Sequence, residues 1–433
     1  MPLRVLLVGS GGREHALAWK LSQSPLLEKM WAAPGNPGTA QYAENLALAA
    51  DDVDGIVQFA QANEISLVVI GPEDPLAMGL ADQLSEVGIR AFGPNKEAAE
   101  LEASKAFCKE ILIRHRIPTA AYRVFSDLNP AVSYLESGAR YPLVVKASGL
   151  AAGKGVYICE VLEEAREAVK SLLMDGRHGD AGRTILIEEF LEGPEASVFA
   201  MTDGRTIIPL ESCQDHKQLL DGGHGPNTGG MGAISPNPLI SERARELIER
   251  QILLPTVHGM NHEGRRFRGI LFAGLKLTPA GPKVLEYNVR FGDPECQILM
   301  MRLQSDLLPL LMGSAQGELE EQDAPRWDER PAVTVVLASG GYPESYPKGL
   351  PITGLESLEQ TPDLQVFHAG TSLSEEGDLQ TSGGRVLAVT ALGDTLSEAR
   401  DRAYEAAEKI HFEGKTLRTD IGVAGVAAME RVQ

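Results

Sequence analysis

Three polar residues alternate with apolar ones at positions 285–290, and their types could hold a metal and a phosphate. If this stretch is a strand, Glu286, Asn288 and Arg290 lie on one face, and the apolar residues between them pack on the other. Carboxylate and amide oxygens suit Mg²⁺, which usually takes one or two protein groups and completes its octahedron with phosphate and water. Arg290 could then stabilise charge on a phosphoryl group during transfer. A structural ion pair is the alternative interpretation.

A second candidate is a loop of small residues within 144–156, between two β-branched, apolar runs. Gly149, Gly153 and Gly155 let backbone N–H groups approach an anion, because glycine tolerates positive φ and has no side chain. Lys146 and Lys154 add positive charge. The spacing does not match a Walker loop. It predicts a strand–loop–strand lid over a nucleotide, although an ordinary glycine-rich hairpin with exposed lysines is the alternative.

The N-terminal strand 3–9 runs into a glycine-rich loop that contains Gly11, Gly12, Arg13 and Glu14. We reject an NAD site, because Glu14 occupies the third glycine position of the dinucleotide fingerprint and strand 30–33 ends without an acidic residue. The loop still directs N–H groups from a helix start, which suits a small anion; a purely structural turn is the alternative. Glu73 follows the strand at 67–71 and is a second candidate in the same crevice.

Residues 211–235 combine six glycines with short polar side chains, so they cannot build a core. A loop of this length is usually functional or disordered, and its Asp, Lys, Asn and Thr favour a substrate loop.

Farther upstream, Glu188-Glu189-Phe190-Leu191 ends a strand and leads into a connector whose backbone could bind an adenine edge, with Glu195 near enough for ribose hydroxyls. This second pattern alone is weak, because Glu-Glu is usually a solvated pair.

The elements that must position these residues change character along the chain. Strands near 3–9, 30–33, 67–71 and 90–92 alternate with helices at 16–22, 52–62 and 76–87, which predicts a doubly wound sheet. A helix over 97–115 carries Lys105. An α+β unit follows, with strands at 121–125 and 184–188 and helices near 128–137 and 162–174. We expect a helix over 241–261, strands at 267–277 and 283–287, and a final unit with strands at 332–338, 364–367 and 385–391 and a helix over 395–410. That last unit carries few convergent polar groups and closes one side of the site.

Composition bounds the possible functions. At 433 residues we expect about three domains, and a hydrophobic share of 43% with a charged share of 23% is typical of a soluble globular protein. The net charge of −20 argues against nucleic acid and anionic membranes as partners. The four cysteines are scattered without a Cys-x-x-Cys pair, and the N-terminus lacks a signal peptide. We therefore expect a cytoplasmic protein, and predict a monomer.

Several motifs together resemble ATP-grasp ligases, and within them the phosphoribosylamine–glycine ligase family of purine biosynthesis. The resemblance rests on the opening Gly9–Ala16, on Lys146–Val156, on the highly specific Gly225-Pro226-Asn227-Thr228-Gly229-Gly230-Met231-Gly232 and on Arg290–Glu295. It covers essentially the full length. It implies an α/β and α+β multidomain chain: a doubly wound pre-ATP-grasp domain (1–103), an ATP-grasp core (104–120 and 190–326), a lid (121–189) and a small α+β C-terminal domain (327–433).

The resemblance also implies a reaction and a set of site residues. ATP, with Mg²⁺ or Mn²⁺, would activate glycine as an acyl phosphate, which the amine of 5-phosphoribosylamine attacks to give glycinamide ribonucleotide, ADP and phosphate. Residues matching the catalytic positions are Arg290, Lys146 and Asp293, and those matching the metal ligands are Glu286 and Asn288. The nucleotide would contact Lys105, Lys146, Gly153, Lys154, Gly155, Glu188, Glu189, Phe190, Leu191 and Glu195. The two other substrates would contact Gly11, Gly12, Arg13, Glu14, Asp215, Lys217, Asn227, Thr228, Gly229 and Asp293.

The chain departs from the family pattern at four positions. Ser148 stands where Asp is common, Gly223 and His224 replace Asp-Thr, and Lys276 occupies an apolar position, from which it could pair with Glu286 or with phosphate. Two alternatives stay open. Another ATP-grasp enzyme, such as a biotin-dependent carboxylase subunit or a purine carboxylating ligase, should lack the Gly-Pro-Asn-Thr-Gly-Gly-Met-Gly stretch. A catalytically dead ATP-binding homologue would have no need of the Glu286–Arg290 row.

Overall fold

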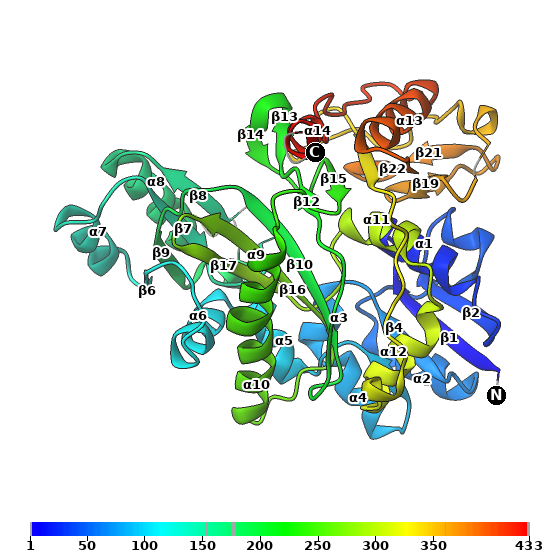
Figure 1. Ribbon diagram of the computed structural model, residues 1–433, viewed down its shortest axis with the longest axis horizontal. Helices are drawn as coiled ribbons and strands as arrows, with labels where there is room; N and C mark the ends of the chain where they lie inside the picture. Colours follow the sequence, from blue (N-terminus) through cyan, green and yellow to red (C-terminus); the bar gives the residue numbers. More distant parts are fainter. Residues whose placement is uncertain (1, 152–154, 175–178, 360, 431–433) are drawn as a thin grey trace.

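The chain begins with an open, five-stranded parallel sheet flanked by helices (Figure 1). The structure, a computed structural model, describes residues 2–151, 155–174, 179–359 and 361–430. The strand order is β3-β2-β1-β4-β5, which confirms the doubly wound prediction. Its elements are β1 Leu3–Gly9, α1 Gly12–Leu21, β2 Leu27–Pro34, β3 Glu44–Asn45, α2 Val53–Ala62, β4 Leu67–Ile70, α3 Glu73–Met78, α4 Leu80–Glu86, β5 Arg90–Phe92 and α5 Lys96–Ala103.

A smaller antiparallel sheet forms the unit that projects at the left of Figure 1. Its strands run in the order β6-β9-β7-β8, and two helices pack against them. The elements are β6 Tyr122–Phe125, α7 Leu128–Glu136, β7 Leu143–Ala147, β8 Val156–Cys159, α8 Leu162–Leu173 and β9 Ile185–Glu189. The predicted hairpin lies between β7 and β8, where Lys146 pairs with Val156. Residues 152–154 of that hairpin, including Gly153 and Lys154, lie outside the described residues.

The central sheet is antiparallel, in the order β11-β10-β16-β17. It comprises β10 Glu195–Thr202, β11 Ile207–Pro209, β16 Gly269–Thr278 and β17 Gly281–Asn288. Strand β17 confirms the predicted alternation, because Tyr287 and Val289 are in the buried core while Glu286, Asn288 and Arg290 are partly exposed. This face of the sheet therefore presents the polar row toward the lid.

The C-terminal sheet contains strands from two distant parts of the sequence. Its order is β12-β15-β18-β22-β19, with β12 Gln214–Asp215, β15 Gly232–Ser235, β18 Ala332–Ala338, β19 Leu364–His368 and β22 Arg385–Leu392. Strands β12 and β15 come from the predicted substrate loop, so this sheet continues across position 327, where we predicted the last domain to start. Between them, β13 Gln218–Leu220 and β14 His224–Asn227 form a hairpin. The glycine-rich stretch is thus attached directly to the C-terminal unit.

Separate apolar clusters stabilise these units. The projecting unit has a core of its own, built from side chains of β7, β9, α7 and α8. A second cluster joins β1 and α1 of the N-terminal sheet to β10 and β16, to α11 Glu295–Arg302 and α12 Leu307–Gln316, and to the C-terminal strands. The three other units are therefore packed together, while the projecting unit can move without opening a shared core.

Three predicted helices are interrupted. The helix expected over 97–115 is two helices, α5 and α6 Lys105–Arg114, separated at Ser104, whose hydroxyl accepts a hydrogen bond from Phe107 N. The helix expected over 76–87 begins at Glu73 and breaks at Gly79, which has a φ of 93°. The helix expected over 241–261 consists of α9 Glu242–Ile248, a π-helical turn Glu249–Leu253 and α10 Leu254–His262. The remaining helices are α13 Leu396–Lys409 and α14 Val423–Glu430.

Candidate active site

A cavity of about 680 Å³ lies where the projecting unit, the central sheet and the two terminal units meet. It brings together residues that the sequence scatters from position 13 to position 293. The predicted site residues that line it are Arg13, Lys105, Lys146, Gly155, Glu188, Glu189, Phe190, Leu191, Glu195, Asp215, Lys217, Asn227, Thr228, Gly229, Glu286, Asn288, Arg290 and Asp293. Gly11, Gly12 and Glu14 lie just behind this wall, next to Asp293 and Arg13.

Lys146 is held in the cavity wall by a buried carboxylate on the neighbouring strand. Its Nζ lies 3.0 Å from Glu188 Oε2, and Lys109 Nζ lies 3.0 Å from the same oxygen. Burial would lower the pKa of Lys146, but Glu188 and Glu286 raise it, so the ammonium stays charged. The other oxygen of Glu188 is buried and has no hydrogen-bond partner among the described residues. The Glu188 side chain therefore holds two lysines in the cavity wall from the second-last residue of β9.

The sequence analysis did not identify Lys109 as a site residue. It lies four residues after Lys105 on helix α6, and this spacing places both on one helix face. The signal was therefore present, although nothing in the sequence marks Glu188 as its partner. Burial lowers the pKa of Lys109, and the adjacent Glu188 carboxylate opposes that shift.

Glu195 and Lys276 face each other across strands β10 and β16. Lys276 Nζ lies 3.1 Å from Glu195 Oε1. The partner of this lysine is therefore Glu195, and not Glu286 or phosphate as we expected from the sequence. Burial would raise the pKa of Glu195, but Lys217 and Lys276 lower it. The carboxylate is therefore ionised.

Three lysines surround Glu286 in the cavity. Lys217 Nζ lies 3.5 Å from its Oε1, and Lys105 and Lys146 are close enough to act on its charge. Burial would raise the pKa of Glu286, yet the lysines, Lys217 first, lower it to about 2. An ionised carboxylate and the Asn288 amide thus line the same cavity from one strand face.

These two side chains fit a site for a hard cation such as Mg²⁺ better than a site for a metal that prefers thiolate or imidazole ligands. Both offer hard oxygen ligands, and among the described residues no group of three or more His, Cys, Asp or Glu side chains could hold an ion by itself. Mg²⁺ typically takes one or two protein ligands and completes its shell with phosphate oxygens and water. The donor set therefore fits a metal that arrives with a phosphate ligand.

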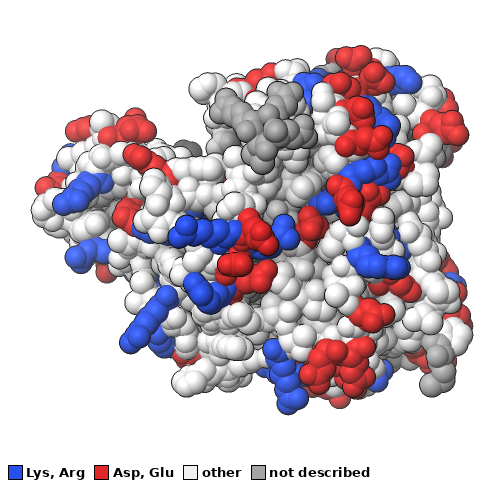
Figure 2. Space-filling view, viewed as in Figure 1, with Lys and Arg blue, Asp and Glu red and all other residues white. Residues whose placement is uncertain are grey.

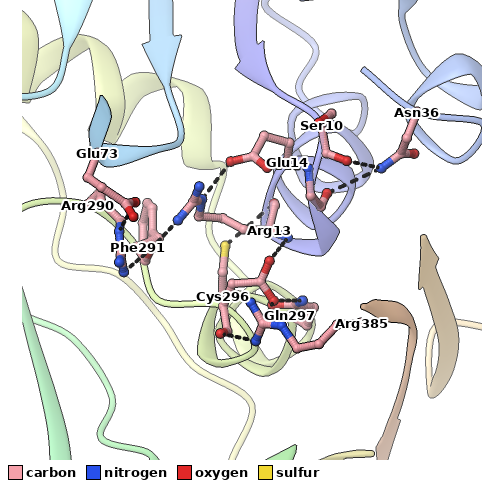
Figure 3. Close-up of polar contacts among 12 residues, drawn as sticks. Ser10, Arg13, Glu14, Asn36, Glu73, Arg290, Phe291, Cys296, Gln297 and Arg385 are labelled. Atoms are coloured by element: carbon pink, nitrogen blue, oxygen red, sulfur yellow. Dashed lines mark hydrogen bonds and ion pairs between the residues drawn. The ribbon is translucent and has the colours of Figure 1, made fainter. Parts of the chain in front are cut away.

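Arg290 is anchored by the carboxyl groups of two glutamates. Its Nε lies 3.1 Å from Glu73 Oε2 (Figure 3). Its Nη2 lies 3.0 Å from Glu102 Oε1. Arg290 lowers the pKa of Glu73 to about 2, whereas burial raises the pKa of Glu102 to about 7. Part of the ion-pair interpretation is therefore correct, and Arg290 also borders the cavity. Glu102 was missed, because its helix gives no sign that it packs under β17.

The glycine-rich loop after β1 is occupied by the protein's own carboxylates (Figure 3). Gly11 N donates to Glu14 Oε2 at 2.6 Å, and Arg13 N donates to Asp293 Oδ2 at 3.1 Å. Arg13 Nε also pairs with Glu14 Oε1 at 2.6 Å. The helix start binds anions as expected, but these anions are side chains, so its N–H groups at Gly11 and Arg13 are not free for a substrate.

Asp293 connects three parts of the molecule. Besides Arg13 N, its carboxylate accepts a hydrogen bond from Gln297 Nε2 at 2.9 Å and faces Arg385 Nη1 at 3.6 Å. Burial would raise the pKa of Asp293, but Arg385 and Arg13 lower it. Arg385 begins β22, in the unit where we expected few convergent polar groups, and that expectation was wrong at this position. No local signal in the sequence marks it.

The substrate loop places another acid in the wall. Asp215 Oδ1 is buried and has no hydrogen-bond partner among the described residues. Burial, together with the charge of Glu295, raises the pKa of Asp215 well above its usual range. Thr228 is ordered by a hydroxyl hydrogen bond to Lys217 O at 2.7 Å, and Gly229 N donates to Tyr342 Oη at 2.9 Å.

Two of the departures from the family pattern have clear structural roles. Ser148 Oγ accepts a hydrogen bond from Ala106 N at 3.1 Å, so it caps the start of α6. Gly223 has a φ of 74° in the turn between β13 and β14, a conformation that favours glycine. His224 begins β14 and is exposed.

On the face shown in Figure 2, acidic and basic side chains are interspersed.

Comparison with known proteins assigns the architecture. Family models described as phosphoribosylglycinamide synthetase match residues 3–102 (N domain), 103–296 (ATP-grasp A domain) and 332–424 (C domain). A phosphoribosylamine–glycine ligase from Caulobacter vibrioides is 53% identical over 420 residues, covering 97% of this chain and 98% of that protein. One from Rhodopirellula baltica is 51% identical over 422 residues, with 96% of each chain covered.

Solved structures agree with these sequence matches. The crystal structure of a phosphoribosylamine–glycine ligase from Thermotoga maritima has a TM-score of 0.84 and 35% identity, and covers 97% of this chain and all (100%) of that one. A biotin carboxylase from Campylobacter jejuni, 14% identical, has a TM-score of 0.74 and covers 98% of this chain and 95% of that one, so it shares the fold alone. The ATP-grasp fold, the N-terminal doubly wound unit and the mixed α/β and α+β architecture are therefore confirmed.

Proposed function

The chain belongs to the phosphoribosylglycinamide synthetase family, and on that basis we propose that it joins glycine to 5-phosphoribosylamine at the expense of ATP. The observation that carries the proposal is the convergence on one cavity of a lysine cluster, the Glu286–Asn288–Arg290 row and the glycine-rich substrate loop. A carboxylate is a poor electrophile, so amide formation in water requires its activation. The cavity has the parts for a phosphoryl transfer followed by an attack of an amine.

In the first step, a glycine carboxylate oxygen bonds to the γ-phosphorus of ATP, and the bond from that phosphorus to the bridging oxygen breaks, which releases ADP. Lys146 and Arg290 lie in the cavity wall as cations, Lys146 held by the buried carboxylate of Glu188 and Arg290 by the carboxylate of Glu73. Charges that are fixed before the reaction stabilise negative charge in transfer without reorganisation. We assign the two residues to this task.

In the second step, the amine of 5-phosphoribosylamine attacks the acyl carbon, the bond from that carbon to the phosphate oxygen breaks, and the amine loses a proton. Asp293 and Asp215 border the part of the cavity next to the substrate loop. We assign Asp293 to positioning the reactants, with Asn227, Thr228, Gly229 and Lys217 as further contacts. Arg13 borders the same region, and Gly11, Gly12 and Glu14 support it from behind.

We assign the nucleotide to the cleft beneath the projecting unit. Lys105, Gly155 and the connector Glu188, Glu189, Phe190 and Leu191 line it, and Glu195 lies beyond the connector for the ribose hydroxyls. Glu286 and Asn288 would hold Mg²⁺ or Mn²⁺, which supplies charge neutralisation between the nucleotide phosphates when bound. Acyl phosphates hydrolyse, so closure of this unit, which has its own core, would exclude water.

The proposal includes a cytoplasmic monomer without nucleic-acid or membrane partners. All four cysteines are buried free thiols, as expected for a reducing compartment. In the described part of the chain, no helix has the length and apolar character that crossing a bilayer requires. Oligomeric state and compartment stay predictions.

The decisive experiment measures ADP release by the purified protein with Mg²⁺-ATP and freshly prepared 5-phosphoribosylamine, with and without glycine. We expect release only when both co-substrates are present. Release with a different carboxylate would retain ATP-grasp chemistry and reject glycine. ATP binding with no release under any condition would identify a catalytically dead homologue.

A further inference from the structure

The amine substrate of the proposed function carries a phosphate group, and this phosphate needs a binding site of its own. Phosphates in proteins are bound by cations or N–H and O–H groups with free donors. Most cations in the cavity wall already pair with a carboxylate among the described residues. These pairs are Arg13 with Glu14, Lys146 with Glu188, Lys217 with Glu286, Lys276 with Glu195, and Arg290 with Glu73 and Glu102.

The glycine-rich loop after β1 does not fill this role alone. The N–H groups of Gly11 and Arg13 donate to Glu14 and Asp293, respectively. A phosphate at this helix start would have to displace two charge-assisted hydrogen bonds. The site must therefore draw its donors from another part of the cavity wall.

Arg385 is the cavity cation with unused donors on the side of the substrate loop. Its Nη1 donates to Gly229 O at 2.7 Å and to Asp293 O at 2.6 Å. Its Nε and Nη2 make no hydrogen bond to any residue that the structure describes, and the side chain is 21% exposed at the cavity. Asp293 Oδ1 forms an ion pair with the same Nη1 at 3.6 Å, so this carboxylate offsets part of the charge of Arg385 without using Nε or Nη2. Half of the guanidinium is thus fixed, and the other half is free.

Gly229 packs against the planar face of this guanidinium. A Cβ atom built at this position would lie 2.8 Å from Arg385 Cζ, 3.0 Å from Nη2 and 3.2 Å from Nε. Any side chain at 229 would therefore push the guanidinium out of the position in which Nη1 is bonded and Nε and Nη2 are left free. Gly229 does not have a positive φ, so its backbone conformation does not by itself require glycine. The close approach to Arg385 is the physical reason for glycine here.

A phenol hydroxyl lies beside this guanidinium. Tyr342 Oη accepts a hydrogen bond from Gly229 N at 2.9 Å, and its own hydrogen has no acceptor among the described residues. Tyr342 and Arg385 both come from the C-terminal unit and both line the cavity. A guanidinium edge and a hydroxyl, held by the same glycine, form a compact set of donors for an oxyanion.

We propose that Arg385 and Tyr342 form the subsite for the phosphate of the phosphoribosyl substrate. Three acids lie close enough to Arg385 to interact with its charge, namely Asp293, Asp215 and Glu295. Asp293 is also bound to Arg13 N and Gln297, and Ser197 donates to Glu295. The C-terminal unit would then select the phosphorylated sugar, while the lid and the central sheet bind the nucleotide.

The test compares binding of ribose 5-phosphate and ribose by isothermal titration calorimetry with the full-length protein. We expect wild type to prefer the phosphorylated sugar. Arg385→Gln should reduce this preference by roughly 10- to 100-fold, the usual value of a charge-assisted hydrogen bond. Tyr342→Phe leaves the Arg385 bonds to Gly229 and Asp293 in place and should reduce the preference by a smaller factor. Arg385→Lys, which keeps the charge, should recover part of the loss.

Arg330→Gln is the matched control, because Arg330 pairs with Asp328 and Asp363 outside this cavity. If Arg385 only positioned the loop, its loss would weaken ribose and ribose 5-phosphate equally. An unchanged preference in Arg385→Gln and Tyr342→Phe, or no preference in wild type, would overturn the proposal. If wild type turns over glycine and 5-phosphoribosylamine but Arg385→Gln keeps the preference for ribose 5-phosphate over ribose, only the subsite is rejected. A phosphate preference that depends on Arg385 without such turnover would reject only the ligase function.

Discussion

Lys217 Nζ lies 3.5 Å from Glu286 Oε1, and this contact connects the substrate loop to the metal-binding row. The same ammonium lies 4.0 Å from Glu195 Oε2. Burial would lower the pKa of Lys217, but the surrounding acids, Glu286 first, raise it. One lysine therefore stands between the proposed nucleotide and substrate ends of the cavity. A cation there can neutralise charge on either side of the group being transferred.

Glu286→Gln tests the metal-binding row. Because the amide cannot supply a negative ligand, we expect kcat to fall by at least about 100-fold. The protein should stay folded, with a lower melting temperature because Lys217, Lys105 and Lys146 lose their carboxylate partner. ADP release and thermal unfolding followed by circular dichroism give the two values. Glu263→Gln, which disrupts a pair with Arg114 far from the cavity, is the control. Loss of folding in Glu286→Gln would assign this residue a structural role instead.

Glu195→Gln tests the ribose assignment. If this carboxylate accepts hydrogen bonds from ribose hydroxyls, wild type should prefer ATP over 2′,3′-dideoxy-ATP by roughly tenfold or more, and the variant should lose most of that preference. KM values for the two nucleotides provide the measurement. Lys276→Met removes the 3.1 Å ion pair but keeps the carboxylate, so it should retain the preference. Equal discrimination in wild type and Glu195→Gln would move the ribose site elsewhere.

Periodicity and motif spacing predicted the parts of this molecule that depend on nearby residues. The βαβ order, the β7–β8 hairpin and the shared face of Glu286, Asn288 and Arg290 follow from local patterns. Side-chain partners did not follow. Glu188 binds Lys146 and Lys109. Glu102 binds Arg290 and also accepts a hydrogen bond from Val289 N, which lies 187 residues farther along the chain.

The missed residues share a physical cause. Arg385 reaches the cavity only because strands β12 and β15 join the C-terminal sheet, and sheet pairing between distant strands leaves no mark on the local sequence. The helix break at Ser104 was missed as well, because good helix formers precede it in residues 96–103 and the one local signal is that serine is a common N-cap residue. Tertiary contacts with the hairpin, through Ser148, decide where α6 begins.

Ser148 offers a test of that contact. Ser148→Ala removes the hydroxyl of a buried side chain and leaves the half-buried Ala106 N without that acceptor, and we expect a loss of about 1 kcal/mol in the free energy of unfolding. Ser148→Asp supplies an acceptor and a negative charge at a helix start, so its stability should stay within about 0.5 kcal/mol of wild type. Chemical denaturation of the three proteins gives the comparison. A larger loss in the aspartate variant than in the alanine variant would contradict the capping role.

The pair of acids around Arg290 predicts opposite pH dependences. The folded-state pKa of Glu102 is about 7 against an ordinary 4.5, because burial disfavours its charge. Between these values the folded protein keeps a proton that the unfolded chain has released, so stability falls as pH rises from 4.5 to 7, by about 3 kcal/mol in total. Glu73, with a pKa of about 2, contributes stability that is present above pH 4.5 and lost as pH falls toward 2.

Urea unfolding between pH 3 and 8 measures both effects by tryptophan fluorescence, because two of the three tryptophans, Trp19 and Trp31, lie in the N-terminal unit that contains both acids. We expect the stability of wild type minus that of Glu102→Gln to decrease from pH 4.5 to 7. The corresponding difference for Glu73→Gln should instead increase from pH 3 to 4.5. Because each comparison uses the change with pH, a constant cost of either substitution cancels. Differences of the same sign for the two variants would refute the assignment of Arg290 as a shared partner of one neutral and one ionised carboxyl group.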